Sequence, residues 1–465
     1  MSHYPTTALD CVNAFALSQI SARELAVAAL ERISAQNEAL NAFTEITGQR
    51  ALAEADALDK AFRRGDGFPT LAAVPYAVKN LFDIAGVTTL AGAQILSRNP
   101  PAERDAVLVE RISAGGGLLM GALNMDALAY GFTTENTYYG VTRNPHDPLR
   151  SAGGSSGGTG AAVAAGLVPI ALGSDTNGSI RVPSSLCGVF GLKPTYGRLP
   201  RTGSFPFVAS FDHLGPLAGN AADLALAYDA MQGHDAGDPA CAQRPVAKTL
   251  DTLKHGMKGL RVARLAGYFD DNAGDEARWA ASVAATALGA CEEVVLEGTD
   301  RARAAAFVIT ASEGGALHLD NLRTRPEEFE PLSVDRLTAG TLVPASWYQH
   351  AQRYRRQYLA RMLALFDKYD VLIAPATPVT APLLGQEYIA IGPRQLPTRP
   401  NLGLLTQPIS FVGMPVAVAP LWPAGGLPIG VQLIAAPWRE DLCLRAAWAL
   451  QEQGLAYSRM PGSAA

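Results

Sequence analysis

Cysteine and histidine are scarce in this chain, and neither is arranged as a metal-binding site. Of the 465 residues, 5 are cysteines and 7 are histidines. The cysteines are scattered and form no C-x-x-C pair: Cys11, Cys187, Cys241, Cys291 and Cys443. An odd number of scattered cysteines indicates reduced thiols rather than a disulfide framework. His146 and His213 lack the spacing of metal ligands, so we expect a structural role for both and no bound metal.

The chain also lacks an excess of positive charge and a long apolar run. Lys and Arg number 38 against 43 Asp and Glu, which gives a net charge of −5. This balance argues against a nucleic-acid-binding surface. No apolar segment approaches the ~20 residues of a membrane span, and the first residues lack the pattern of a secretory signal. We therefore expect a cytoplasmic protein with neither nucleic acid nor membrane as a partner.

Helical and strand patterns alternate in the first part of the chain. Ser21 and Glu24 have the spacing of a helix capping box. An apolar segment at residues 71–78 reads as a buried strand that leads into Lys79, and a helix is expected at residues 106–114. This alternation favours an α/β fold with a mixed or parallel sheet.

Strand patterns return near the end of the sequence. They lie at residues 371–375, 416–420 and 429–434. Because they are so far from the first strands, one sheet closed by C-terminal strands is favoured over two independent domains. We expect a single domain over residues 1–465, in which residues of about 221–340 form a more helical peripheral layer.

Two clusters of glycine and serine flank one helix–strand unit. They read GGSSGG at residues 153–158 and DTNGS at residues 175–179. No lysine follows the glycines as a phosphate-binding P-loop requires. Residues 153–157 fit the G-x-S-x-G of a nucleophile elbow, but a polar, proline-rich loop at 143–150 stands where that motif has a buried strand. Structural turns remain an alternative, which the recurrence of serine among glycines makes less attractive.

Lys79 can supply a base that the two clusters lack. It ends an apolar segment, and the first acid after it is Asp83. Burial disfavours the charged form of lysine and lowers its pKa, and a lysine that is neutral near pH 7 can act as a general base. The alternative is a lysine whose stem is buried and whose ammonium group reaches water.

These residues belong to a longer series of motifs. The series comprises VKN at residues 78–80, GGSSGG at 153–158, DTNGSIRVP at 175–183, CGVFGLKPTYGR at 187–198 and DHLGP at 212–216. In order and spacing it resembles the amidase signature family. The resemblance implies a mixed β-sheet core covered by helices on both faces. It also implies hydrolysis of amides without a metal or an organic cofactor.

The resemblance further implies a role for each motif residue. Ser179 would be the nucleophile, and Ser155, after a cis peptide bond from Gly154, would connect it to the base Lys79. An acyl-enzyme would form on Ser179 and be hydrolysed by water. The oxyanion would be bound by the backbone amides of Thr176, Asn177, Gly178 and Ser179.

Asn177 departs from the family pattern. Many members carry two glycines before the nucleophile, and Asn177 replaces one of them here. The asparagine indicates a more fixed loop or a side chain that contacts the substrate. Simple tolerance of the substitution is an equal alternative.

Beyond the core motifs, the chain is similar to one branch of the family. The similarity includes residues 80–84, 130–136, 306–314, 330–336 and 432–438. That branch hydrolyses a small acidic ureide, 1-carboxybiuret, with release of ammonia, in bacterial breakdown of cyanuric acid. It works with a small helical partner that resembles the C subunit of the tRNA-dependent amidotransferase. The resemblance therefore implies such a partner, in a homodimer or heterotetramer.

Three other functions remain open. The chain could be the glutamine-hydrolysing A subunit of the amidotransferase, a broad-specificity amidase, or a non-catalytic binding subunit. The A subunit typically carries an aspartate for the glutamine amino group, whereas residues 401–404 contain no acid here. A carboxylated substrate needs a cationic partner. Arg336 and Arg323 are the candidates, with ordinary surface arginines as the alternative.

Overall fold

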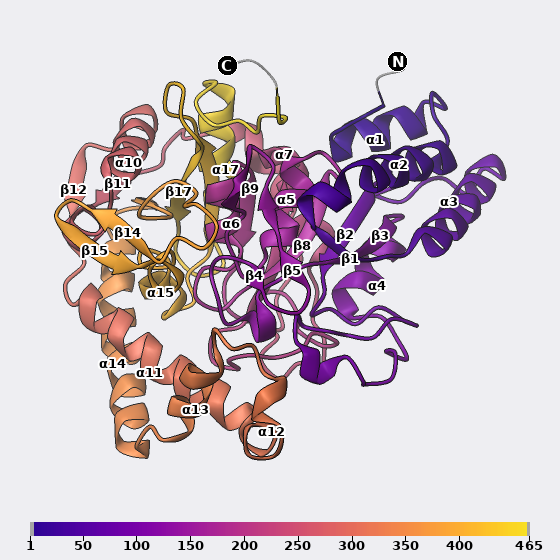
Figure 1. The fold of residues 1–465 in the computed structure, drawn as a ribbon. Helices are drawn as coiled ribbons and strands as arrows, with labels where there is room; N and C mark the ends of the chain where they lie inside the picture. Colours follow the sequence, from indigo (N-terminus) through magenta and orange to yellow (C-terminus); the bar gives the residue numbers. More distant parts are fainter. Residues whose placement is uncertain (1–3, 463–465) are drawn as a thin grey trace.

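The computed structural model describes residues 4–462, and one large sheet runs through it. The sheet has 11 strands in the order β1-β3-β2-β8-β10-β9-β16-β17-β13-β11-β12. Their bounds, in the same order, are Phe43–Ile46, Leu118–Leu123, Pro75–Lys79, Ile170–Asp175, His213–Ala218, Phe190–Lys193, Val416–Leu421, Ile429–Ile434, Val371–Pro375, Val262–Leu265 and Glu292–Val294. Helices α1–α3 lie toward one end of this sheet and strands β11 and β12 at the other (Figure 1).

The sheet is mixed, which confirms the predicted α/β class. Strand β2 runs parallel to β3 and β8, and β11 runs parallel to β12 and β13. The other neighbours are antiparallel. Within the described residues, three small hairpins lie outside the sheet: β4 (Glu135–Asn136) with β5 (Gly140–Val141), β6 (Arg143–Asn144) with β7 (Asp147–Ser151), and β14 (Tyr388–Ile391) with β15 (Arg394–Pro397).

Helices cover both faces of the sheet. Every residue of β2, β3, β8, β9, β10, β13, β16 and β17 is buried, as expected for strands covered on both sides. The helices are α1 (Ala8–Ala16), α2 (Ala22–Leu40), α3 (Gly48–Arg63), α4 (Val107–Ala114), α5 (Gly157–Ala164), α6 (Arg181–Cys187), α7 (Ala221–Met231), α8 (Thr249–Thr252), α9 (Tyr268–Asp271), α10 (Asp275–Ala287), α11 (Thr299–Leu317), α12 (Leu319–Thr324), α13 (Val334–Thr341), α14 (Ala345–Phe366), α15 (Thr398–Asn401), α16 (Gln407–Ser410) and α17 (Glu440–Glu452).

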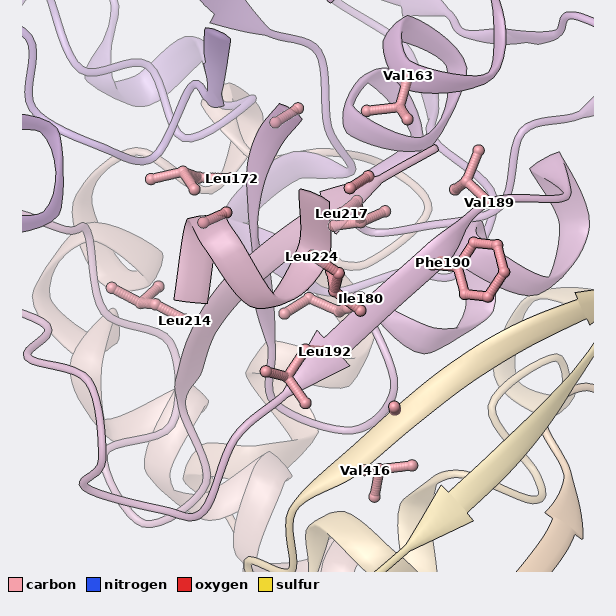
Figure 2. Packing of buried hydrophobic residues seen from close by; sticks show 14 of the residues in the cluster. Val163, Leu172, Ile180, Val189, Phe190, Leu192, Leu214, Leu217, Leu224 and Val416 are labelled. Atoms are coloured by element: carbon pink, nitrogen blue, oxygen red, sulfur yellow. The ribbon is translucent and has the colours of Figure 1, made fainter. Parts of the chain in front are cut away.

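The central core lies where α5 and α7 pack on strands β8, β9 and β10. Figure 2 shows side chains from these elements and from β16 gathered there: Val163, Leu172, Phe190, Leu192, Leu214, Leu217, Leu224 and Val416. Removal of such side chains from water supplies the main free energy of folding, at about 1.5–3 kcal/mol for each large apolar residue. Strands β2 and β8 are part of this core, which fixes their positions. The ends of these two strands carry the polar residues described below.

Most of the expected elements occur close to their predicted positions. Ser21 and Glu24 form the capping box at the start of α2, and β13, β16 and β17 coincide with the predicted C-terminal strands within one residue. Residues 221–340 are largely helical, but they also contribute β11 and β12 to one edge of the sheet. Strand β12 reads EEV and is mostly exposed, so it has no apolar alternation to reveal it.

Among the described residues, no helix has the length and apolar character needed to cross a bilayer.

Candidate active site

Lys79 stands at the end of β2 and points its amino group at two serines. Its Nζ lies 2.7 Å from Ser155 Oγ and 2.8 Å from Ser174 Oγ. Ser174 is on the neighbouring parallel strand β8, and Ser155 precedes α5. The sheet register thus brings together groups that are far apart in the sequence.

The environment of Lys79 favours the neutral amine. The side chain is 0% exposed, so its amino group does not reach solvent. Burial lowers the pKa of Lys79 to about 7, although Asp126, Asp175 and Asp212 act in the opposite direction. A substantial fraction of neutral amine is therefore present at neutral pH, hydrogen-bonded to hydroxyl groups that can exchange a proton with it.

The first glycine–serine cluster leads into α5. The Gly154–Ser155 peptide bond is cis, as the family resemblance implies. Asp126 lies beside this segment: its backbone amide donates to Ser155 O at 3.1 Å, and its carboxylate accepts the amides of Thr133 and Thr134. These contacts fix the backbone on which Ser155 is presented to Lys79.

The second cluster forms a loop between β8 and α6. Within residues 4–462, none of the backbone amides of residues 176–179 donates a hydrogen bond to another group of the protein. Gly178 has φ +140°, and a Cβ atom there would collide with the Thr406 side chain. Ser179 follows directly and is 2% exposed. The loop therefore offers free N–H groups beside a serine hydroxyl, which suits the binding of an oxyanion.

A buried ion pair anchors both ends of this loop. Asp175 ends β8, Arg181 begins α6, and both side chains are 0% exposed. Arg181 donates to both Asp175 carboxylate oxygens at 2.9 Å, to Gln432 Oε1 at 2.7 Å and to Thr406 O at 3.1 Å. Burial alone would raise the pKa of Asp175, but the Arg181 guanidinium outweighs it and holds that pKa below its usual range.

Ser179 opens into a narrow pocket next to a wider one. The narrow pocket encloses ≈ 20 Å³ and is lined by Thr176, Asn177 and Ser179 together with Tyr130, Arg336 and Gln407, among others. The wider cavity, ≈ 270 Å³, reaches Ser174 and shares Ala129, Thr176 and Phe207 with the narrow one. The space beside Ser179 is thus much smaller than the cavity that reaches Ser174.

The structure brings only one of the two predicted arginines to the Ser179 pocket. Arg336 lines the pocket, donates to Tyr130 O at 3.0 Å and lies over the Tyr130 ring at 4.1 Å. Burial lowers the pKa of Arg336, and within the described chain it forms no ion pair with a carboxylate. Arg323 is exposed on α12 and does not line the pocket, because α12 presents that face to solvent.

Sequence reasoning missed several residues of the site. Ser174 is the second partner of Lys79, Asp126 supports the Ser155 segment, and Gln407 lines the pocket. Asp126 comes shortly after the apolar strand β3, and a polar residue at the end of a buried strand is a pattern that could have indicated a site residue. Ser174 and Gln407 gave no signal, because their proximity arises from sheet register and from the fold of the C-terminal segment.

The residues that the structure describes contain no cluster of three or more His, Cys, Asp or Glu that could hold a metal ion. His213 Nδ1 instead contacts the backbone oxygens of Asp175 and Phe211. His146 Nε2 contacts Cys187 O. Both histidines therefore contact backbone oxygens.

Comparison with known proteins places this geometry in a family. The family model described as amidase matches residues 24–444. The AtzE component of the 1-carboxybiuret hydrolase of Pseudomonas sp. (strain ADP) is 59% identical over 450 residues, which cover 96% of this chain and 98% of that protein. The glutamyl-tRNA(Gln) amidotransferase of Moorella thermoacetica has an A subunit that is 36% identical, with 99% of each chain covered.

A solved structure shows the same fold. It is described as an unexpected vestigial protein complex that reveals the evolutionary origins of an s-triazine catabolic enzyme. It has a TM-score of 0.96 and 58% identity to this chain, and the match covers 97% of this chain and 100% of that one. From the family match, these relatives and the shared fold, we conclude that the chain belongs to the amidase signature family and is an amidase.

Proposed function

We propose that this amidase hydrolyses a small acidic ureide, 1-carboxybiuret, and releases ammonia through an acyl-enzyme on Ser179. The observation that carries the proposal is the buried contact of Lys79 Nζ with Ser155 Oγ at 2.7 Å, combined with a Lys79 pKa of about 7. A neutral lysine bonded to a serine is a base that can draw a proton through that serine. The 59% identity to a component of a 1-carboxybiuret hydrolase supports the choice of substrate.

The proposed reaction uses Lys79, Ser155 and Ser179 in two stages. Ser179 Oγ attacks the carbonyl carbon while its proton passes to Ser155 and the Ser155 proton passes to Lys79. The amides of Thr176, Asn177, Gly178 and Ser179 stabilise the oxyanion, and the C–N bond breaks as the proton returns to the leaving nitrogen. Water then attacks the acyl-enzyme with the same base and regenerates Ser179.

Arg336 is proposed to bind the substrate carboxylate. Its guanidinium lies in the Ser179 pocket, is partly buried and has no carboxylate partner among the described residues. A carboxylate that enters the pocket would complete a charge-assisted pair with it. None of the described residues that line this pocket is acidic, so no carboxylate there competes for the guanidinium.

Glutamine hydrolysis is the second candidate, because amidotransferase A subunits reach 36% identity to this chain. The segment at 401–404 argues against it. Asn401 Oδ1 accepts a hydrogen bond from Arg303 at 2.7 Å, and a Cβ atom at Gly403 would overlap the Phe132 ring. A pocket bordered by an arginine and closed by an aromatic ring offers no anion for the ammonium group of glutamine.

A small helical partner protein is proposed as well, in a homodimeric or heterotetrameric assembly. The support is that the solved relative at 58% identity is described as a protein complex. Copurification of the partner with the tagged chain, followed by mass measurement of the complex, tests this assembly.

The decisive experiment measures ammonia release by the purified chain and by its Ser179→Ala variant. The substrates are 1-carboxybiuret formed in situ from cyanuric acid, glutamine and a simple aliphatic amide. We expect release from the ureide that disappears in Ser179→Ala and persists in Ser97→Ala, since Ser97 is exposed and does not line the pocket. Release mainly from glutamine or from the simple amide would refute the substrate assignment, and release by Ser179→Ala would refute the nucleophile.

A further inference from the structure

Gln407 presents an oriented amide to the Ser179 pocket. It is the first residue of α16, lines the pocket and is 2% exposed. Its Oε1 accepts a hydrogen bond from Arg303 Nε at 2.9 Å. The hydrogen bond of this side chain among the described residues is made by Oε1, and none is made by Nε2.

Arg303 determines which end of that amide faces the pocket. A guanidinium carries only donors, so the group it contacts on Gln407 must be the carbonyl oxygen. Arg303 lies on α11, and its guanidinium donates hydrogen bonds to Asn401 Oδ1 at 2.7 Å and to Pro400 O at 3.3 Å. The guanidinium also lies over the Phe307 ring, 5.0 Å from its centre. Gln407 Nε2 is thereby directed away from Arg303, as a donor for whatever occupies the pocket.

Asn177, which also lines the pocket, carries an unpaired acceptor. Its Nδ2 donates to Thr310 Oγ1 at 3.0 Å, and its Oδ1 is buried without a partner. An unpaired buried oxygen is unfavourable, and a ligand N–H that bonded to it would remove that penalty.

Among the described residues that line the pocket, the one charged side chain is the cation Arg336. Arg303 stands behind the lining residue Gln407, to which it donates a hydrogen bond, and neither arginine forms an ion pair within the described chain. No carboxylate is among the described lining residues. Such a site attracts an anionic end group and repels an ammonium group.

We propose that Arg303 is a positioning residue that sets Gln407 Nε2 as a donor for an acidic substrate, while Asn177 Oδ1 accepts an N–H of the same molecule. This inference rests on the proposed function and refines its substrate class. The ligand is a short, planar amide or ureide with a carboxylate at one end and an N–H beside the scissile carbonyl. Substrates that carry an ammonium group are disfavoured.

The test uses two stable ligands that differ in charge, malonamate and its neutral analogue malonamide. Each is assayed for protection of Ser179 against a fluorophosphonate probe in the full chain. We expect malonamate to protect at a concentration at least about tenfold lower than malonamide, as one charge-assisted contact implies. In Gln407→Glu the pocket gains a negative charge, and the preference should disappear.

Variants of Arg303 separate positioning from folding. Arg303→Met should lose most of the preference for malonamate over malonamide. Arg303→Lys can still donate to Gln407 Oε1 and should retain part of that preference. Asn177→Gly should weaken both ligands equally, because both carry amide N–H groups. Arg323→Met is the matched control on an exposed arginine and should behave as the wild type.

An unchanged preference in both Gln407→Glu and Arg303→Met would overturn the inference, as would a wild type without any preference. The rate of fluorophosphonate labelling without any ligand reports whether each variant keeps its Ser179 site. If Gln407→Glu does not fold, Gln407→Leu replaces it. If Ser179 failed to react with the probe, the proposed nucleophile would be wrong. The charge preference would then be measured by calorimetry of malonamate and malonamide binding.

Discussion

Lys79 and Lys193 are both 0% exposed, and burial lowers the pKa of each to about 7. Their partners differ. Lys193 Nζ donates to the backbone oxygens of Pro194 and Met414, which cannot give or take a proton. Lys79 Nζ contacts the hydroxyl groups of Ser155 and Ser174. The lowered pKa therefore gives Lys79 a proton-transfer partner, whereas Lys193 only bonds to backbone oxygens and has no group with which to exchange a proton.

The first prediction concerns the pH dependence of hydrolysis. Only neutral Lys79 can accept a proton, and its pKa is about 7. The value of kcat/KM should fall as pH decreases below about 7, by roughly tenfold per pH unit, and should level off above it. A pH–rate profile with the neutral aliphatic amide measures this without titration of the substrate.

Two variants sharpen that measurement. Lys79→Met should lower kcat/KM by about 10²–10⁴-fold, the usual contribution of a general base. Lys193→Met removes the other buried lysine and should leave the midpoint of the profile in place. A rate that rises steadily to pH 10 would contradict the lowered pKa of Lys79.

At the scale of single residues, the sequence indicates which residues belong to the site better than it indicates which of them are in contact. Short motifs predict Lys79, Ser155 and Ser179 from residue type and spacing, and the structure brings Lys79 into contact with Ser155. Arg336 and Arg323 could not be ranked, since α12 and α13 place one toward the pocket and one toward solvent, and the sequence does not show how these helices are turned. Gln407 was missed for a similar reason: its orientation depends on Arg303, about a hundred positions earlier in the chain.

At the scale of elements, the unit formed by β8, the loop after it and α6 carries the Ser179 site. Strand β8 is held between β2 and β10, and α6 packs on β16 and β17. The Asp175–Arg181 pair joins the end of the strand to the start of the helix. The position of the free amides in the loop therefore depends on this pair as much as on the glycine within the loop.

The second prediction is that this ion pair is essential for stability. Arg181→Met leaves the Asp175 carboxylate buried without its partner, which should lower the free energy of unfolding by about 3–5 kcal/mol. Combining Arg181→Met with Asp175→Asn should recover part of the loss, because no charge then remains buried. Urea denaturation followed by circular dichroism measures both values.

A surface ion pair gives the matched comparison. Arg23 and Asp56 are 51% and 56% exposed, so Arg23→Met should lower stability by less than about 1 kcal/mol. A loss in Arg181→Met no larger than that would show that the buried pair does not hold the loop.

Elements with strong local signals were predicted well, and those defined by tertiary contacts were not. The capping box and the apolar strands β13, β16 and β17 are encoded by nearby residues. Strand β11 has only 4 residues and β12 has 3, and each is defined by its neighbour in the sheet. Strands as short as these leave almost no periodic pattern in a sequence.

At the scale of the whole molecule, the two halves of the chain meet inside the sheet. Strand β9 comes from the first half and β16 from the second, and they pair in antiparallel register from Lys193 with Val416 to Gly191 with Val418. The Arg181 contacts with Thr406 and Gln432 cross the same boundary. The pocket also takes residues from both halves, so neither half could complete it alone.

The third prediction is that the chain unfolds as one cooperative unit, which tests the single-domain expectation. All tryptophans lie in the second half of the sequence: Trp279, Trp347, Trp422, Trp438 and Trp448. Tryptophan fluorescence therefore reports on that half, whereas far-UV circular dichroism reports on every helix. Because the β9–β16 ladder and the buried Arg181 contacts must break before either half can open, the urea transitions from the two signals should coincide in midpoint and slope. Transitions with separate midpoints would show that the halves unfold independently and that the chain has two domains.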